Sequence, residues 1–299
     1  MQTLLLIGCG DVARRATPWL TKRFRVIALL RDPDNAQEWR DLGCSPLIAD
    51  LDQPRTLQRL QGLAQAVLHL APPPLKGLTD TRTRNLLNAL GTGKGASLPA
   101  RLVYVSTTGV YGDGASAEIN ETAPCAPKTD RAHRRVSAET QLRDWGRQTG
   151  CRVTLLRAPG IYAAERLPEE RLRQGLPALV DSEDVFTNHI HADDLARACC
   201  LALFRGKPGR AINVSDDSAL KMGDYFDAVA DACHLPRPPR LSRQALEQQV
   251  SPVQLSFMSE SRRIQNHRLK HELRLKLAYP TVADTLAAIN QAEMALKSL

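Results

Sequence analysis

Over the first 157 residues of this 299-residue chain, short aliphatic or β-branched runs alternate with stretches of amphipathic, helical spacing. This alternation is typical of parallel strands, because a crossover between parallel strands needs a long connection that is usually a helix. Right-handed crossovers then predict an α/β fold, a Rossmann-type doubly wound sheet with helices on both faces. The predicted strands are Thr3–Ile7, Arg25–Leu30, Pro46–Ala49, Ala66–Leu70, Arg101–Ser106 and Arg152–Arg157. The predicted helices lie near 11–22, 34–42, 54–62, 79–91 and 130–149.

The alternation stops after residue 157, which divides the chain into two expected domains. Residues 1–157 form the dinucleotide-binding Rossmann domain, and residues 158–299 form mainly a smaller lobe for the substrate. Segments at about 185–214 are expected to return to the main sheet. Within the second part, 158–183 has no regular pattern; short strands are predicted at Phe186–His191 and Ala211–Val214, and helices at Asp193–Phe204, 221–234 and 281–297.

Composition and charge exclude several classes of function. The net charge of +8 comes largely from scattered arginines without a basic run, so we expect no nucleic-acid partner. Seven cysteines, an odd number with no C-x-x-C, argue against a disulfide framework or metal site and favour a reducing, cytoplasmic location. The apolar run Leu4–Ile7 is too short for a signal peptide or a membrane span, so we expect no membrane partner.

A glycine-rich turn follows the first predicted strand, with the pattern Gly8-x-Gly10-x-x-Ala13. Gly8 permits a tight turn, Gly10 lets the backbone approach a pyrophosphate, and Ala13 allows close packing of helix on strand. The helix begins with Asp11 and Val12, and its free N–H groups and positive dipole end favour an anion. The alternative is a tight turn that binds nothing. The position directly after the first strand favours a dinucleotide site.

The end of the second predicted strand indicates which dinucleotide is preferred. An acidic residue there bonds the ribose 2′-hydroxyl of NAD, whereas an arginine accommodates the 2′-phosphate of NADP. The sequence reads ALLRDPD, with Arg31 first and Asp32 next, about 20 residues beyond the glycines. We therefore expect NADP as the preferred cofactor and NAD as the alternative, because a shift of one residue would exchange the two roles. A solvated surface charge is the other interpretation of Arg31.

Hydroxyl side chains end the fifth predicted strand, in the sequence LVYVSTTGVYG at residues 102–112. Open α/β sheets hold their ligands at the carboxyl ends of strands, so we expect Ser106 and Thr107 at a ligand site. The segment resembles the active-site strand of the extended short-chain dehydrogenases/reductases, which typically reads Ser-Ser-x-x-Val-Tyr-Gly. The resemblance places Thr107 at the catalytic Ser/Thr position, where the hydroxyl polarises the substrate oxygen, and Ser106 beside the cofactor.

The same family carries a Tyr-x-x-x-Lys pair on the next helix, and there this sequence departs from the pattern. In DRAHRRVSAE, counting back from Ala138-Glu139 puts Arg135 at the Lys position and Arg131 at the Tyr position. Arg131 cannot act as the acid, because arginine stays protonated, but it can hold a carboxylate or phosphate or stabilise an oxyanion. Arg135 can still bond the cofactor ribose. Tyr111 is the first candidate to move a proton, and packing at the strand-to-loop corner is its alternative role.

Motifs in the rest of the chain extend the resemblance to nearly its whole length. LRAPGIY at 156–162 is similar to the family's stretch beside the nicotinamide, and NHIHADDLA at 188–196 is similar to Ile-His-Val-Asp-Asp-Leu-Ala. In the second motif we expect Asp193 or Asp194 to cap the following helix and no metal site. The resemblance assigns the cofactor further contacts after several strands: Asp50, Leu51, Leu70, Ala71, Pro72, Pro159 and Ile161.

The chain is identified as an atypical extended member, like the NAD-dependent epimerases and dehydratases, that lacks the Tyr. This implies an NAD(P)-dependent oxidoreductase, epimerase or dehydratase acting on a small carbonyl or hydroxyl substrate, with nucleotide-linked sugars included. A non-catalytic NAD(P)-binding sensor or scaffold is the alternative, because the acid is missing. By analogy we expect a homodimer through the helices at 79–91 and 130–149.

Overall fold

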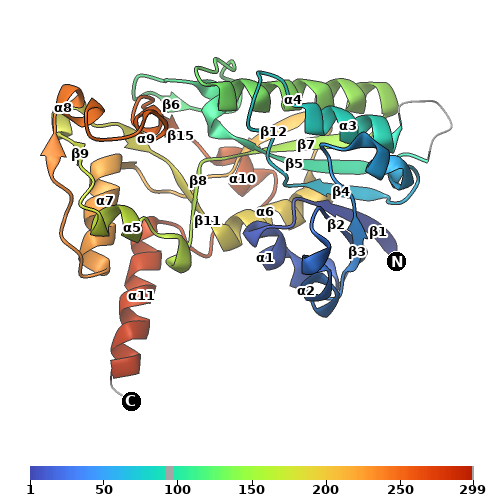
Figure 1. The fold of residues 1–299 in the computed structure, drawn as a ribbon, viewed down its shortest axis with the longest axis horizontal. Helices are drawn as coiled ribbons and strands as arrows, with labels where there is room; N and C mark the ends of the chain where they lie inside the picture. Colours follow the sequence, from blue (N-terminus) through green and yellow to red (C-terminus); the bar gives the residue numbers. More distant parts are fainter. Residues whose placement is uncertain (92–96, 298–299) are drawn as a thin grey trace.

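A seven-stranded parallel sheet forms the centre of the computed structural model, which describes residues 1–91 and 97–297 (Figure 1). The strand order is β12-β7-β5-β4-β1-β2-β3, and every neighbouring pair is parallel. The α/β, doubly wound fold class predicted from the sequence is therefore confirmed. The strands are β1 Gln2–Ile7, β2 Phe24–Leu30, β3 Ser45–Ile48, β4 Ala66–His69, β5 Arg101–Thr107, β7 Arg152–Ala158 and β12 Arg210–Asn213.

Helices cover both faces of this sheet and create two separate hydrophobic cores. One core packs α1 (Asp11–Leu20), α2 (Ala36–Asp41) and α6 (Ala192–Arg205) against one face. The other packs the 3-10 helix η2 (Pro54–Leu60), α3 (Thr81–Leu90) and α4 (Asp130–Thr149) against the opposite face. Both faces of the central strands are thus buried, which explains why they appear in the sequence as continuous apolar runs rather than alternating ones.

The predicted helices differ from the observed ones mainly at their ends. The segment predicted at 54–62 is the 3-10 helix η2, and the segment at 34–42 divides into η1 (Pro33–Asn35) and α2. α3 begins only after Asp80, whose carboxylate accepts a hydrogen bond from the Thr83 N–H at 3.1 Å. These boundaries depend on capping and turn geometry, which hydrophobic spacing alone does not report.

The C-terminal part adds a smaller lobe with its own apolar core (Figure 1, left). Its residue range 158–183, which has no regular pattern in the sequence, contains several short elements, and the strand expected at Phe186–His191 divides into two. The elements outside the central sheet and its covering helices are η3 Thr108–Tyr111, β6 Glu118–Ile119, β8 Gly160–Tyr162, η4 Ala164–Arg166, α5 Glu169–Arg173, β9 Ala178–Leu179, η5 Asp181–Glu183, β10 Phe186–Thr187, β11 His189–His191, β13 Leu220–Lys221, α7 Met222–Ala232, β14 Arg240–Leu241, α8 Arg243–Glu247, α9 Pro252–Phe257, β15 Arg263–Ile264, α10 His267–His271 and α11 Val282–Lys297.

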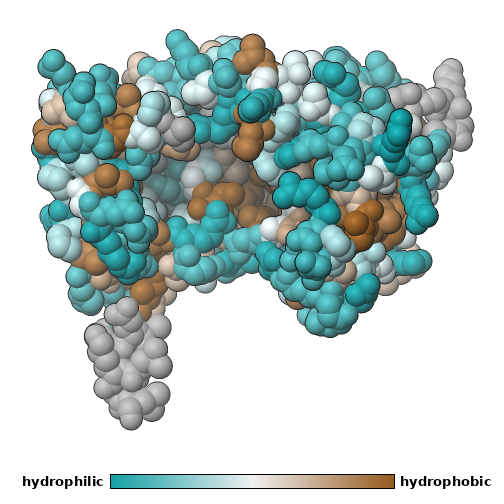
Figure 2. Space-filling model, viewed as in Figure 1, coloured by the Kyte–Doolittle hydropathy of each residue, from teal (hydrophilic) through white to brown (hydrophobic). Residues whose placement is uncertain are grey.

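The lobe is continuous with the sheet through β12. This strand pairs with β7 at the edge of the central sheet, whereas β10 and β11 pair with β13 and β8 in separate two-stranded sheets. The carboxyl ends of the central strands face the lobe (Figure 1). The molecular surface is hollowed between the two parts, with hydrophobic residues at the floor of the hollow (Figure 2). Among the helices of residues 1–91 and 97–297, none combines the length and the hydropathy that a membrane span needs.

A buried ion pair fastens α4 to the central sheet. Arg157, on β7, donates from Nε and Nη2 to the two carboxylate oxygens of Glu139 at 3.0 and 2.7 Å. The side chains are 3% and 1% exposed. The interaction with Glu139 outweighs burial and raises the pKa of Arg157. Removing one partner of such a pair leaves the other charge buried without compensation.

We predict that Glu139→Ala lowers the free energy of unfolding by about 3–5 kcal/mol, because Arg157 would remain buried without its carboxylate. Urea unfolding followed by circular dichroism measures this. Asp144→Ala is the matched control on the same helix: its ion pair with Arg147 is exposed, and a change below about 1 kcal/mol is expected. Equal losses in the two variants would contradict the buried-pair interpretation.

Candidate active site

The turn after β1 brings the backbone very close to the segment after β4. Gly8 has φ +86°, and a Cβ built there would lie 2.2 Å from the backbone N of Ala71. Only glycine therefore fits this position. Gly10 is the N-cap of α1 without a side-chain capping bond, and a Cβ built on it would meet no atom within 4 Å. The open space in front of a helix N-terminus fits the pyrophosphate of a dinucleotide.

A cavity of about 480 Å³ extends from this turn along the carboxyl ends of β1 to β4. It lies at the position where strand order reverses, which is the usual ligand site in open α/β sheets. The structure brings many of the expected cofactor residues together in its wall. The lining residues are Ile7, Gly8, Cys9, Gly10, Arg14, Leu29, Leu30, Arg31, Asp32, Asn35, Trp39, Ala49, Asp50, Leu51, Leu70, Ala71, Pro72 and Arg82.

The remaining expected cofactor residues are placed around this wall rather than in it. Ala13, on α1, is completely buried in the core between this helix and the sheet, and Val12 packs against the same core. Asp11 is turned to side-chain partners, since its carboxylate accepts from Arg15 and Arg166 at 2.9 Å each. Their backbone N–H groups still belong to the first turn of α1, which faces the opening at Gly10.

Arginines in the cavity wall differ in whether a carboxylate already neutralises them. Arg14 bonds Glu38 in two places, and Arg82 bonds both carboxylate oxygens of Asp52. Arg31 is exposed and has no hydrogen bond or ion pair with any residue in the described ranges. The carboxylate of Asp32 already has a partner in the following turn, since its Oδ1 accepts a hydrogen bond from the N–H of Asp34 at 3.0 Å. Arg31 is thus the guanidinium left for a ligand anion.

A second, smaller cavity of about 190 Å³ lies where β5 and β7 end. It brings together Thr107, Arg131 and Pro159 from the sequence predictions. It also contains residues from the C-terminal lobe that no motif had indicated. The lining residues are Thr107, Thr108, Gly109, Thr129, Arg131, Ala132, Pro159, Gly160, Phe186, Thr187, Asn188, Met222, Ser256, Phe257, Glu260 and Arg262.

The two hydroxyl groups at the end of β5 differ in whether they already have a hydrogen-bond partner. Thr107 Oγ1 accepts a hydrogen bond from the N–H of Gly109 at 3.2 Å, which leaves its own proton available to a substrate oxygen. Ser106 is buried, and its Oγ has no hydrogen-bond partner in the described chain. An unpartnered buried hydroxyl is costly, so a ligand that bonds Ser106 would be favoured. Ile161, the last expected cofactor contact, packs against the hydrophobic core.

The structure places Tyr111 away from both cavities, so its expected role in moving a proton stays a prediction. Its side chain is buried, and its hydroxyl donates to Oδ1 of Asn213, on β12, at 2.7 Å. The guanidinium of Arg157 lies over its ring. Tyr111 lines neither cavity, so its placement matches the alternative role of packing at the strand-to-loop corner. Burial also raises its pKa, which makes the hydroxyl a poorer proton carrier.

The two arginines on α4 are placed in different surroundings. Arg131 lies in the first turn and its guanidinium stacks over the ring of Phe257 at 4.2 Å. Arg135 lies one turn further along, and its Nη1 donates to the Tyr104 hydroxyl and the Val105 carbonyl, both at 2.8 Å. Arg135 lines neither cavity and fastens α4 to β5; the expected bond to a cofactor ribose stays a prediction.

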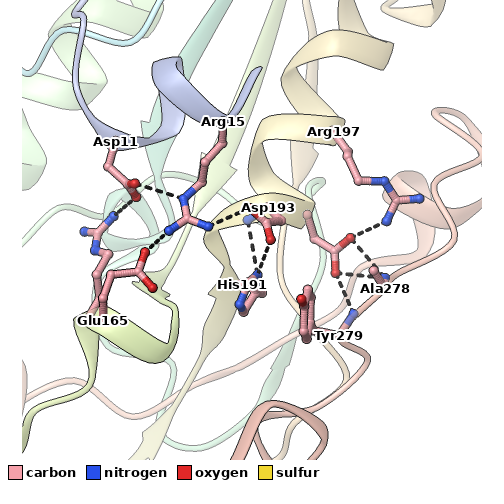
Figure 3. Close-up of polar contacts among 10 residues, drawn as sticks. Asp11, Arg15, Glu165, His191, Asp193, Arg197, Ala278 and Tyr279 are labelled. Carbon is pink, nitrogen blue, oxygen red and sulfur yellow. Dashed lines mark hydrogen bonds and ion pairs between the residues drawn. The ribbon is translucent and has the colours of Figure 1, made fainter. Parts of the chain in front are cut away.

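An ionic cluster connects the start of α1 to the C-terminal lobe (Figure 3). Arg15 bonds Asp11, Asp193 on α6 and Glu165 on η4. The expected cap of α6 is corrected here: the Asp193 N–H donates to Nδ1 of His191 at 3.2 Å, so His191 is the N-cap. Asp194 instead accepts from the backbone N–H groups of Ala278 and Tyr279. These contacts hold the lobe beside the glycine turn.

Asp216, on the loop after β12, carries a strongly perturbed carboxyl group. It is 4% exposed, and burial raises its pKa to about 7, although a hydrogen bond from the Ser218 N–H at 2.9 Å lowers it. It lines a third cavity, of about 370 Å³, that borders the second one. A carboxyl held neutral up to this pH costs the folded state stability once it ionises.

Comparison with known proteins agrees with the fold. Residues 15–215 match the model of the NAD dependent epimerase/dehydratase family. The chain belongs to this family. The extended short-chain dehydrogenase/reductase resemblance seen in the sequence is thereby confirmed at the level of the family.

The individual proteins that the chain matches have low sequence identity to it. The chain is 26% identical over 122 residues to a human dTDP-D-glucose 4,6-dehydratase, covering 38% of this chain and 35% of that protein. It is 31% identical over 180 residues to a UDP-glucose 4-epimerase of Azospirillum brasilense, covering 56% and 47%. The matches thus span less than half the length of these curated relatives. A functionally unknown conserved protein from Silicibacter pomeroyi DSS has a similar structure, with 29% identity, a TM-score of 0.80 and coverage of 98% and 99%.

We predict that Asp216→Asn removes part of the pH dependence of stability. The folded carboxyl stays protonated up to about pH 7, whereas the unfolded one ionises near 3.8. The folded state then binds more protons than the unfolded state in that window, so stability falls as pH rises through it. Asn does not titrate, so the variant should gain on the wild type by up to about 4 kcal/mol by pH 8.

Urea unfolding across that pH window measures the difference between the two proteins. Asp217→Asn is the matched control. The Asp217 carboxyl is next to Asp216 in the chain, but it is exposed and pairs with Lys270 at 2.6 Å. A difference between wild type and Asp216→Asn that does not change with pH would show that Asp216 is already ionised when folded.

Proposed function

We propose that this protein is an NAD(P)-dependent oxidoreductase, or an epimerase or dehydratase that works through a transient oxidation. The proposed substrate is a small carbonyl or hydroxyl compound. One observation carries the proposal: the glycine-turn cavity and the Thr107 cavity open along the same carboxyl edge of one sheet. A dinucleotide bound across that edge would have its adenosine in the first cavity and its reactive ring toward the second.

NADP is the proposed preferred cofactor. Arg31 supports this choice, because it is the cavity arginine without a carboxylate partner in the described chain. Asp32 supports NAD less, because its carboxylate already caps the turn at Asp34. A guanidinium in this place would bind a 2′-phosphate through charge-assisted hydrogen bonds.

The residues around the reaction centre would bind the substrate and stabilise the charge that develops on it. A nicotinamide, when bound, supplies or accepts a hydride. The Thr107 hydroxyl donates to the substrate oxygen and stabilises charge that develops there. Arg131 binds an anionic group of the substrate and thereby orients it. With Tyr111 bonded to Asn213, the proton is exchanged with water in the cavity rather than with a tyrosine.

The names of the relatives make nucleotide-linked sugars the first substrate class to compare. We also propose a cytoplasmic protein without nucleic-acid or membrane partners. Its homodimer would form through α3 and α4, which pack side by side. Light scattering on purified protein tests the homodimer, and a monomer at all concentrations would exclude it.

A non-catalytic dinucleotide-binding protein is the second candidate. The observation that favours it is the burial of Tyr111, which leaves the second cavity without a tyrosine among its lining residues. Consumption of NADPH with any carbonyl substrate would exclude this candidate, whereas tight binding without turnover would favour it.

We predict that NADPH binds more tightly than NADH and that Arg31→Ala removes the difference. Loss of one charge-assisted contact should weaken NADPH binding by about 10- to 100-fold and leave NADH binding unchanged. Fluorescence titration with each dinucleotide measures both constants. Arg25→Ala is the matched control, because Arg25 is an exposed arginine at the other end of β2.

Three outcomes separate the possibilities. Weaker NADPH binding in Arg31→Ala alone would support the cofactor proposal. Equal weakening in Arg25→Ala would mean that general surface charge, and not a 2′-phosphate site, attracts NADPH. No binding of either dinucleotide to the wild type would mean that the Gly8–Ala13 turn is only an element of the fold, and the proposed function would fail.

A further inference from the structure

The second cavity contains more positive than negative charge, and its charges are unequally paired. Arg262 Nη1 donates to Oε2 of Glu260 at 2.7 Å and to the Gly112 carbonyl at 2.5 Å. Both side chains of this ion pair are nearly buried, at 12% and 11% exposed. Arg262 is therefore neutralised by Glu260, and the remaining guanidinium in the cavity wall is that of Arg131.

Arg131 is held in place without a direct ion pair, although the Glu260 carboxylate in the same wall interacts with it at longer range. Arg131 makes no hydrogen bond or ion pair with another described residue, and its guanidinium lies 4.2 Å from the centre of the Phe257 ring. Phe257 is 53% exposed, so the stacked pair lies at the mouth of the cavity rather than in the core. Stacking on an aromatic face fixes the plane of a guanidinium and leaves its N–H groups at the ring edge free. Arg131 is thus preorganised to bind a planar anion.

The cavity pairs this guanidinium with a hydrogen-bond donor for a second group. Thr107, at the end of β5, has its oxygen occupied by the Gly109 N–H, so its proton can be donated to a ligand oxygen. A ligand that spans Arg131 and Thr107 therefore carries an anionic group at one end and a carbonyl or hydroxyl oxygen at the other. Arg131, Arg262 and Glu260 together give the cavity wall a single net positive charge. This charge matches a monoanion better than a dianionic phosphate.

The space around these groups is small. The cavity volume of about 190 Å³ is below the ~300–1,000 Å³ that is usual for drug-sized ligands. A nucleotide-linked sugar would have to continue into the bordering third cavity, which shares Phe186, Thr187 and Asn188 with it. That cavity has no surplus of cations for a diphosphate, because the carboxylates of Glu118 and Asp217 equal the cations of Arg263 and Lys270 even with Asp216 protonated.

The cations of the third cavity are also already paired. Lys270 bonds Asp217 at 2.6 Å, and Arg263 lies near Glu118 and donates to the Ser116 carbonyl. Asp216 adds a further carboxyl group to the same wall. A diphosphate placed there would meet carboxylates without a free cation to compensate them.

We infer that this protein acts on a short carboxylic acid and not on a nucleotide-linked sugar, and that Arg131 binds its carboxylate. The inference rests on the proposed function for the reaction, but the binding site itself can be tested separately. Phe257 is a positioning residue that holds the Arg131 guanidinium. Thr107 binds the oxygen on the reacting carbon.

The test uses saturation-transfer NMR and calorimetry on the full-length protein, first without and then with NADPH. The probes are small carboxylic acids that carry a carbonyl group, including 2-oxobutyrate and acetoacetate, each compared with its methyl ester, and UDP-glucose. We expect the acids to bind, the esters to bind at least about 10-fold more weakly, and UDP-glucose not to bind.

Variants then assign the effect to one side chain. Arg131→Ala should weaken acid binding by about 10- to 100-fold, and Arg131→Lys should restore part of it because the charge returns. Phe257→Leu should weaken it less. His133→Ala is the matched control, since His133 is exposed on the same turn of α4 and lies outside the cavity.

The outcomes separate this inference from the proposed function. Equal binding of acid and ester, no binding of any acid, or Arg131-dependent binding of UDP-glucose would each overturn the inference while leaving NADPH binding intact. Absence of NADPH binding would overturn the proposed function, and acid binding measured without cofactor would still decide the role of Arg131. An unchanged circular dichroism spectrum and urea midpoint in Arg131→Ala show that the variant is folded.

Discussion

The site depends on the close approach of two backbone segments at the middle of the sheet. Gly8, after β1, lies so near the Ala71 amide that no side chain fits between them. This approach forces a tight turn, so α1 starts at once and directs its N-terminus to the edge between β1 and β4. Because the strand order reverses there, the first cavity opens at that point, and the second lies further along the same carboxyl edge, after β5 and β7. The glycine turn therefore determines where an anionic cofactor can bind.

Pairing of charges then decides which cations remain for ligands. Arg14, Arg82 and Arg262 line the two cavities, but each one bonds a carboxylate of the protein. Arg31 and Arg131 do not, within the described ranges. In a chain with a net charge of +8, the total charge is thus less informative than the position of these two side chains. These two side chains are the ones on which the cofactor and substrate proposals depend.

Local pattern was sufficient for the strands and for part of the site, and insufficient where distant segments meet. β1, β2, β4, β5 and β7 could be predicted because burial on both faces produces continuous apolar runs. Thr107 and Arg131 could be found by counting along motifs. Tyr111 could not be placed, because its hydroxyl bonds Asn213, which lies 102 residues later in the chain. No local spacing reports such a partner.

By itself, the sequence determined the parallel α/β sheet and the glycine turn at its first crossover. These features follow from residue periodicity and from steric limits on single positions. Only the tertiary structure decided which charges are paired, that Phe257 stacks on Arg131, and how small the second cavity is. The physical reason is that these properties arise between β5, α4 and α9, which are far apart in the chain and meet only after folding.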